Sequence, residues 1–180
     1  MRDDAGMRLR IVVLAVLAAA LTVPGATEAD PSPSQQVFTK SLLDDPGTSA
    51  QIKRLLTQHQ GMVDPRSGFV DVTGDGRQDA LVLVTTGGAA ATVALYVFST
   101  HGQPAGTGDQ TKLKVLFRLQ SLYRATLRLN GTTVSVLEPR YAAGDDLCCP
   151  KKLRERDYAF DAKRLTFRRT ADHEVPFTTR

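Results

Sequence analysis

The middle of the chain holds two apolar runs whose composition is typical of buried β-strands. Ala80–Val84 reads ALVLV and Thr92–Phe98 reads TVALYVF, so β-branched, aromatic and other apolar residues dominate both. Gly87 and Gly88 lie between them, where a hairpin needs a turn. Because neither run alternates with polar residues, we expect both strands to be buried on two faces and central in a sheet.

Alternation and turn residues indicate further strands on both sides of this pair. Gly68–Val72 precedes it, and Asn130-Gly131 and Asp161–Arg164 each predict a hairpin further along the chain. In Leu113–Ser121 the apolar residues recur at every second position, which predicts that they share one face. These residues are Leu113, Val115, Phe117 and Leu119.

Two helices are expected before the strands. Apolar residues at helical spacing predict a short helix that ends at Asp44–Gly47. Thr48 and Gln51 have the spacing of a capping box, which predicts the start of a second helix that Gly61 closes. The predicted fold class is therefore α+β, a mostly antiparallel β-sheet of about six or seven strands with one or two N-terminal helices.

The first residues have the composition of an export signal. Three arginines precede the apolar stretch Ile11–Val23, whose 13 residues are fewer than the about 20 that a membrane-spanning helix needs. Small residues at Thr27 and Ala29 suit a signal peptidase. We expect a secreted, extracellular or cell-wall-associated protein with no transmembrane span after cleavage; an uncleaved anchor is the alternative. The expected divisions are a signal peptide (1–29), a linker and short helix (30–47), a single α+β domain (48–172) and a C-terminal tail (173–180).

The segment Asp71–Asp79, DVTGDGRQD, has the pattern of a cation-binding loop. Calcium takes several oxygen ligands from one short segment, and the candidates here are Asp71, Thr73, Asp75 and Asp79. An EF-hand also needs a glutamate at the twelfth position, where this chain has Val82. The loop instead resembles the D-x-[DNT]-G-D-G-x-x-D loop of FG-GAP/VCBS-type β repeats, which implies Ca²⁺. Alternatively, the aspartates only order a turn by accepting backbone hydrogen bonds.

Both cysteines of the chain are adjacent, at Cys148 and Cys149. Neighbouring Cα atoms lie about 3.8 Å apart, which is less than the about 4.4–6.8 Å of most disulfides. A bond between the two closes an eight-membered ring and forces a sharp turn. Three interpretations stay open: a rigid disulfide turn between strands, a redox-labile switch or ligand contact, and intermolecular pairing or free thiols.

The C-terminal part of the chain is basic. Residues 112–180 hold 15 basic and 8 acidic residues, a net charge of +7, and the run Lys151, Lys152, Arg154 and Arg156 follows the cysteines. Arg154 and Arg156 share one strand face. The run is a candidate anion-binding site for an anionic cell-wall polymer, although such runs also occur on solvated faces. No nucleic-acid partner is expected, because no nucleic-acid-binding fold signature accompanies the charge.

The order of these motifs resembles a known family. A D-x-x-G-D-G-x-x-D loop, the strand DALVLV, the segment GDDLCCP and a terminal Y-x-[FW] hairpin follow one another over about residues 68–169. This order is similar to that of the LppP/LprE-like secreted and lipid-anchored bacterial proteins. The resemblance implies a β fold outside the cytoplasm and no established activity. No cysteine lies near the expected cleavage site, so lipid anchoring is not implied.

No catalytic residues are assigned, and an enzyme is not expected. The three histidines lack metal-ligand spacing, and neither G-x-S-x-G nor H-E-x-x-H occurs. A hydrolase that uses Asp145 and Asp146 is disfavoured, because adjacent strand residues point to opposite faces. The sequence thus predicts a secreted or cell-wall-associated, non-enzymatic binding module with a structural Ca²⁺ loop. The alternative is a redox-active or redox-sensing extracellular protein that uses Cys148 and Cys149.

Overall fold

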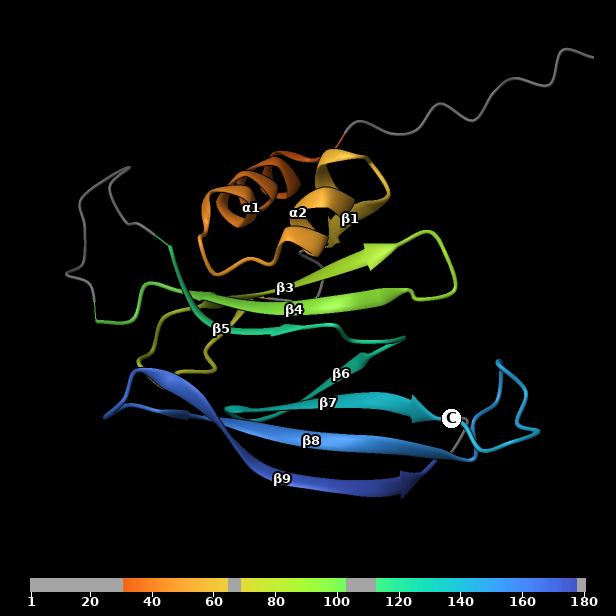
Figure 1. The fold of residues 1–180 in the computed structure, drawn as a ribbon. Coiled ribbons are helices and arrows are strands. Elements are labelled where there is room, and N and C mark those ends of the chain that lie inside the picture. The colour runs from red at the N-terminus through yellow and green to blue at the C-terminus, as the bar shows by residue number, and fades with distance from the viewer. Residues whose placement is uncertain (1–30, 65–68, 103–112, 178–180) are drawn as a thin grey trace, which may run out of the picture. The chain divides into compact units, whose positions relative to one another are not determined.

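A computed structural model describes residues 31–64, 69–102 and 113–177, which form two helices and nine strands in two antiparallel sheets (Figure 1). The α+β class is confirmed, with more strands than the six or seven predicted. The expected signal peptide lies outside the described residues. The elements are α1 (Pro33–Asp44), α2 (Ala50–Thr57), β1 (Gly61–Asp64), β2 (Phe69–Val70), β3 (Asp79–Thr86), β4 (Thr92–Ser99), β5 (Lys114–Gln120), β6 (Thr126–Asn130), β7 (Thr133–Arg140), β8 (Lys152–Asp161) and β9 (Thr166–Pro176).

The two sheets divide the strands by position in the chain. The first, here called the N-terminal sheet, has the order β1-β3-β4-β5, and β2 also pairs with β3. The second, the C-terminal sheet, has the order β6-β7-β8-β9. The helices cover one face of the N-terminal sheet, and the C-terminal sheet covers its other face (Figure 1). The result is three layers: helices, sheet and sheet.

Strands β3 and β4 are central and buried on both faces, as predicted. Their alternate side chains enter two separate cores. Val82 and Tyr96 pack beneath Phe38 and other helix residues. Leu81 and its neighbours on the opposite face pack against residues of the C-terminal sheet, including Val134. Burial on both faces explains why these strands lack polar alternation.

The helix starts differ from the prediction. The capping box belongs to α1, where Ser32 and Gln35 exchange side-chain and backbone hydrogen bonds. The predicted box at Thr48 and Gln51 is wrong, because the N-cap of α2 is Ser49. Helix α2 ends at Thr57, and Gly61 begins β1 instead of closing the helix. Since α1 shares the core with α2, the segment predicted as a linker and short helix belongs to the domain.

Strand β5 contains a bulge that the alternating pattern does not show. The pairing with β4 shifts between Val97 and Phe98, so that Val97 pairs with Phe117 and Phe98 pairs with Val115. As a result Val115 packs against the helix-side core, whereas Phe117 and Leu119 pack toward the C-terminal sheet. The prediction that Val115 and Phe117 share a face is therefore wrong.

Both predicted hairpins of the C-terminal sheet are present. The first turns at Gly131 and Thr132, because Asn130 pairs with Thr133. In the second, β9 continues to Pro176, so residues 173–176 lie in the sheet and not in a tail.

Within the described residues, no helix is both long and apolar enough to cross a membrane.

Candidate anion-binding site

The inner face of the C-terminal sheet changes from apolar to charged along its strands. In β7, Val134 and Val136 are buried against the N-terminal sheet, and Glu138 and Arg140 follow at the same alternate positions. Val136 pairs with Arg156 of β8, so Arg156 also points inward. Where the inner face is charged, a pocket of about 310 Å³ lies between β5, β7 and β8. Its lining comprises Leu119, Gln120, Ser121, Leu122, Tyr123, Glu138, Pro139, Arg140, Arg154 and Arg156.

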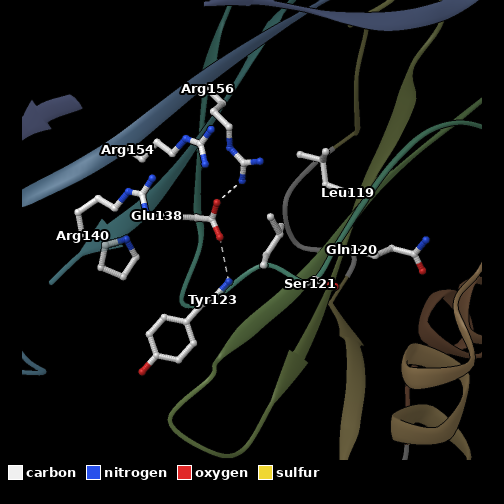
Figure 2. A pocket seen from close by; sticks show the side chains of 10 residues that line it. Leu119, Gln120, Ser121, Tyr123, Glu138, Arg140, Arg154 and Arg156 are labelled. Carbon is white, nitrogen blue, oxygen red and sulfur yellow. Dashed lines mark hydrogen bonds and ion pairs between the residues drawn. The ribbon is translucent and has the colours of Figure 1, made fainter. Parts of the chain in front are cut away.

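Glu138 and the arginines make the central contacts of the pocket. Figure 2 shows the Glu138 carboxylate between the Arg156 guanidinium and the backbone of Tyr123. Glu138 Oε2 accepts a hydrogen bond from Arg156 Nη2, and Glu138 Oε1 accepts one from the Tyr123 amide at 3.0 Å. This carboxylate therefore ties the loop after β5 to β8 and holds Arg156 in place.

Arg154 is held by a carboxylate on the neighbouring strand. Its Nε and Nη2 donate to the two oxygens of Asp172 at 2.7 and 2.6 Å. Hydrogen bonding from Arg154 lowers the pKa of Asp172 to about 2. Asp172 also pairs with Arg169, which adds positive charge around this carboxylate. Arg154 is therefore oriented, and its positive charge is balanced locally.

Two guanidinium groups in the pocket keep unused donors. Within the described residues, Arg156 Nε is buried and has no hydrogen-bond partner. Among the described residues, the Arg140 guanidinium has no hydrogen-bond or ion-pair partner. Its charge acts at longer range on Glu174, whose pKa is lowered chiefly by Lys152. A buried donor without an acceptor costs free energy, and an anion in the pocket would supply the acceptor.

The structure gathers only part of the predicted basic run. Arg154 and Arg156 line the pocket, whereas Lys151 pairs with Asp145 at 3.3 Å and Lys152 pairs with Glu174 at 2.9 Å. Arg140 was missed. Its alternate spacing from Val134 and Val136 was the available signal, but only the strand pairing shows that this face continues beside Arg154 and Arg156.

The Asp71–Asp79 loop is ordered by backbone amides that donate hydrogen bonds to its carboxylates. Asp71 accepts the amides of Gly74, Asp75 and Gly76 at 2.6–3.2 Å. Burial acts to raise the pKa of Asp71, but these donors, Gly76 first, outweigh it and lower the pKa. Asp79 Oδ2 accepts the amides of Val72 and Thr73. These contacts match the alternative interpretation, in which the aspartates form a turn.

The predicted cation ligands are not assembled into a metal cluster. Among the residues that the structure describes, no group of three His, Cys, Asp or Glu side chains is placed to hold a metal ion. Asp75 Oδ2 faces His101 Nδ1 at 3.0 Å, and Thr73 Oγ1 lies 3.5 Å from Asp71 Oδ1. Asp79 is fully buried, and in the described structure its Oδ1 has no hydrogen-bond partner. That oxygen is the one feature of the loop that favours a cation.

Cys148 and Cys149 form a disulfide in the connection between β7 and β8. Both residues are exposed, and the Cys149 amide donates to the Asp146 carbonyl at 3.0 Å. The Asp145 carboxylate is buried and accepts the Ala142 amide at 2.9 Å, which lowers its pKa. Asp145 thus orders the loop, while Asp146 is exposed.

Comparisons of this chain with known protein families, with curated proteins and with solved structures find no match.

Proposed function

We propose that this protein is a non-enzymatic module that binds an anionic cell-wall polymer through the arginine pocket. The observation that carries the proposal is the buried Nε–H of Arg156, which has no acceptor within the described structure. An anionic oxygen of a ligand would supply that acceptor. Arg140 supplies a second guanidinium that is free to bind the same group. The pocket supplies donors and charge, which bind an anion without a reaction step.

The chemistry favours a phosphate group as the bound unit. A guanidinium is a planar fork that donates paired hydrogen bonds to phosphate or carboxylate oxygens. Glu138 and Asp172 already neutralise part of the charge of Arg156 and Arg154, so Arg140 contributes the largest unbalanced charge. A volume of about 310 Å³ lies at the small end of ligand pockets and suits one anionic unit of a polymer.

The proposed place of action is outside the cytoplasm, on the cell wall or in the medium. This rests on the signal-like composition of residues 1–29 and on the likeness to LppP/LprE-like proteins. Intact mass of protein collected from culture medium tests it, with a product that begins at Asp30 as the expected result. A cell-bound product that keeps Met1 or Met7 contradicts it.

Binding of a labelled poly(glycerol phosphate) oligomer at low salt tests the pocket. Arg140→Gln should weaken binding about tenfold or more, because a hydrogen bond to a charged group contributes about 1.5–3 kcal/mol. Arg168→Gln is the matched control: it removes the same charge from an arginine that pairs with Asp161 and does not line the pocket. Equal weakening by both variants would show diffuse charge attraction and overturn the pocket site. A DNA oligomer of equal charge should bind more weakly.

A structural calcium ion in the Asp71–Asp79 loop is a second candidate function. The buried Asp79 Oδ1 supports it, because a cation would satisfy this oxygen. The loop's resemblance to FG-GAP/VCBS-type loops supports it independently. Asp71, Thr73 and Asp75 would supply the remaining side-chain oxygens.

Thermal unfolding in chelator and in millimolar Ca²⁺ tests this candidate. Calcium should stabilise the native protein by about 2.7 kcal/mol at a hundredfold excess over Kd. Asp79→Asn should abolish this gain, and Asp145→Asn, outside the loop, should keep it. A native melting temperature that does not respond to calcium would leave the aspartates as turn-forming residues only.

A further inference from the structure

The disulfide loop is connected to the arginine pocket by a continuous set of contacts. The Leu147 carbonyl, directly before Cys148, accepts hydrogen bonds from Arg124 Nη1 and, at 2.9 Å, from Tyr141 Oη. Arg124 Nη1 also donates to Tyr141 Oη at 3.0 Å. Two donor groups are thus fixed around one carbonyl oxygen, and the adjacent disulfide restricts the backbone that carries it.

Tyr141 continues this connection to the pocket wall. Its ring packs edge-to-face on Tyr123, with centroids 6.4 Å apart. Tyr123 lines the pocket, and its amide donates to Glu138, which holds Arg156 (Figure 2). Tyr141 also directly follows Arg140, the arginine with unused donors. Tyr141 and Tyr123 therefore connect the disulfide turn to the two guanidinium groups with unused donors, those of Arg140 and Arg156.

From this geometry we infer that the Cys148–Cys149 disulfide is a redox gate for the arginine pocket. The inference rests on the proposed anion-binding function. The oxidised pair closes a small ring that restricts the backbone between two residues and holds the Leu147 carbonyl beneath Arg124 and Tyr141. This preorganises the pocket wall, so the oxidised protein is the form that binds tightly.

The gate opens by thiol–disulfide exchange with a dithiol reductant. A thiolate of the reductant attacks one exposed sulfur, the Cys148–Cys149 bond breaks, and a mixed disulfide forms. The second thiol of the reductant then attacks the reductant's own sulfur in the mixed disulfide. The protein sulfur leaves as a thiolate, and the reductant departs as a cyclic disulfide. Two electrons and two protons pass to the protein, which ends with two thiols. The freed backbone lets Leu147 leave Arg124 and Tyr141, and binding must then reorder the pocket wall.

The first measurement compares the Kd of the poly(glycerol phosphate) oligomer for the oxidised protein and for the dithiothreitol-reduced, alkylated protein. Reordering two aromatic side chains predicts about fivefold weaker binding after reduction. A Cys148→Ser/Cys149→Ser variant should bind as weakly without reductant and should not respond to it. Arg124→Gln should weaken binding by the oxidised protein and remove most of the redox response. Arg168→Gln is the control that should keep that response.

The second measurement needs no ligand and separates the two proposals. Hydrogen–deuterium exchange of the segment that contains the Tyr123 amide should accelerate on reduction, because its acceptor Glu138 lies in the pocket wall. Faster exchange without polymer binding in either redox state supports the gate and contradicts the proposed ligand. Equal affinity and equal exchange in both states overturn the gate and leave the proposed function standing.

Discussion

Asp172 accepts hydrogen bonds from two arginines, Arg154 and Arg169. The sequence showed a basic run but not this acidic partner, which reaches Arg154 only through the pairing of β8 with β9. At the scale of single residues, the site was therefore predictable where side chains follow each other in one strand, as Arg154 and Arg156 do. It was not predictable where the partner lies on another strand.

The pKa of Asp172 makes part of the stability depend on pH. Its value of about 2 in the folded protein lies below the ordinary 3.8. The contribution of the carboxylate is therefore present above about pH 4 and is lost as the pH falls toward 2. Urea unfolding should show Asp172→Asn less stable than the native protein at pH 6, with a smaller difference at pH 3.

The control for this prediction is Asp146→Asn. Asp146 is exposed, and its side chain makes no hydrogen bond or ion pair with the residues described in the structure. Its replacement should leave the free energy of unfolding nearly unchanged at both pH values. A constant difference between native protein and Asp172→Asn across this range would contradict the assigned titration.

At the scale of elements, local signals predicted the hairpins well and β5 poorly. The hairpin at Asn130-Gly131 is present because a glycine turn suits the twist of paired strands. In β5 the bulge turns Val115 toward the helices and Phe117 toward the C-terminal sheet, and both positions are apolar. Alternating apolar residues cannot reveal this change of face, since both sides of the N-terminal sheet are buried.

The helix starts were also predicted poorly, although a correct signal was present in the sequence. Ser32 and Gln35 had the spacing of a capping box, with Pro33 at the first helical position. This signal was available in the sequence, but the proline-containing segment has the composition of a linker. Thr48 had the same spacing from Gln51, yet it lies one residue before the true N-cap, and its hydroxyl donates to Asp45.

The turn between β6 and β7 provides a test at this scale. Gly131 has a φ of 57°, and no atom beyond the glycine and its two chain neighbours lies within 4 Å of the position that a Cβ would take. Gly131→Ala should therefore cost about 1 kcal/mol from backbone conformation alone. Gly87→Ala is the control, because Gly87 has equal space and no positive φ. Chemical denaturation measures both, and equal losses would contradict the turn geometry.

At the scale of the whole molecule, the sequence predicted the class but not the division into two sheets. Strand count and layer order depend on which strands pair, and β5 and β6 follow each other in the chain without pairing. The arginine pocket depends on this division, because it lies between β5 of one sheet and β7 and β8 of the other. Within the C-terminal sheet, the register of β7 against β8 brings Arg140 beside Arg154 and Arg156, and the sequence does not show that register.

Phe117 is the side chain whose replacement best tests the packing of the two sheets. Its ring lies 4.8 Å from Tyr158 and 5.3 Å from Phe167, measured between centroids. Phe117 is half-buried, so Phe117→Ala should lower the free energy of unfolding by about 2 kcal/mol, less than at a fully buried core position. Phe69→Ala, at a side chain that is 54% exposed, should cost clearly less. Equal losses in urea unfolding would contradict the sandwich packing.

The connectivity of the sheets has a consequence for how the chain folds. Strands β3, β4 and β5 pair in chain order, as do β6, β7, β8 and β9. Such nearest-neighbour pairing keeps contact order low for a β protein, which favours rapid folding. Contacts between the sheets, such as that of Phe117 with Phe167, join more distant segments. Contacts between the sheets therefore close longer loops than the hairpins within either sheet do, and forming them costs more chain entropy.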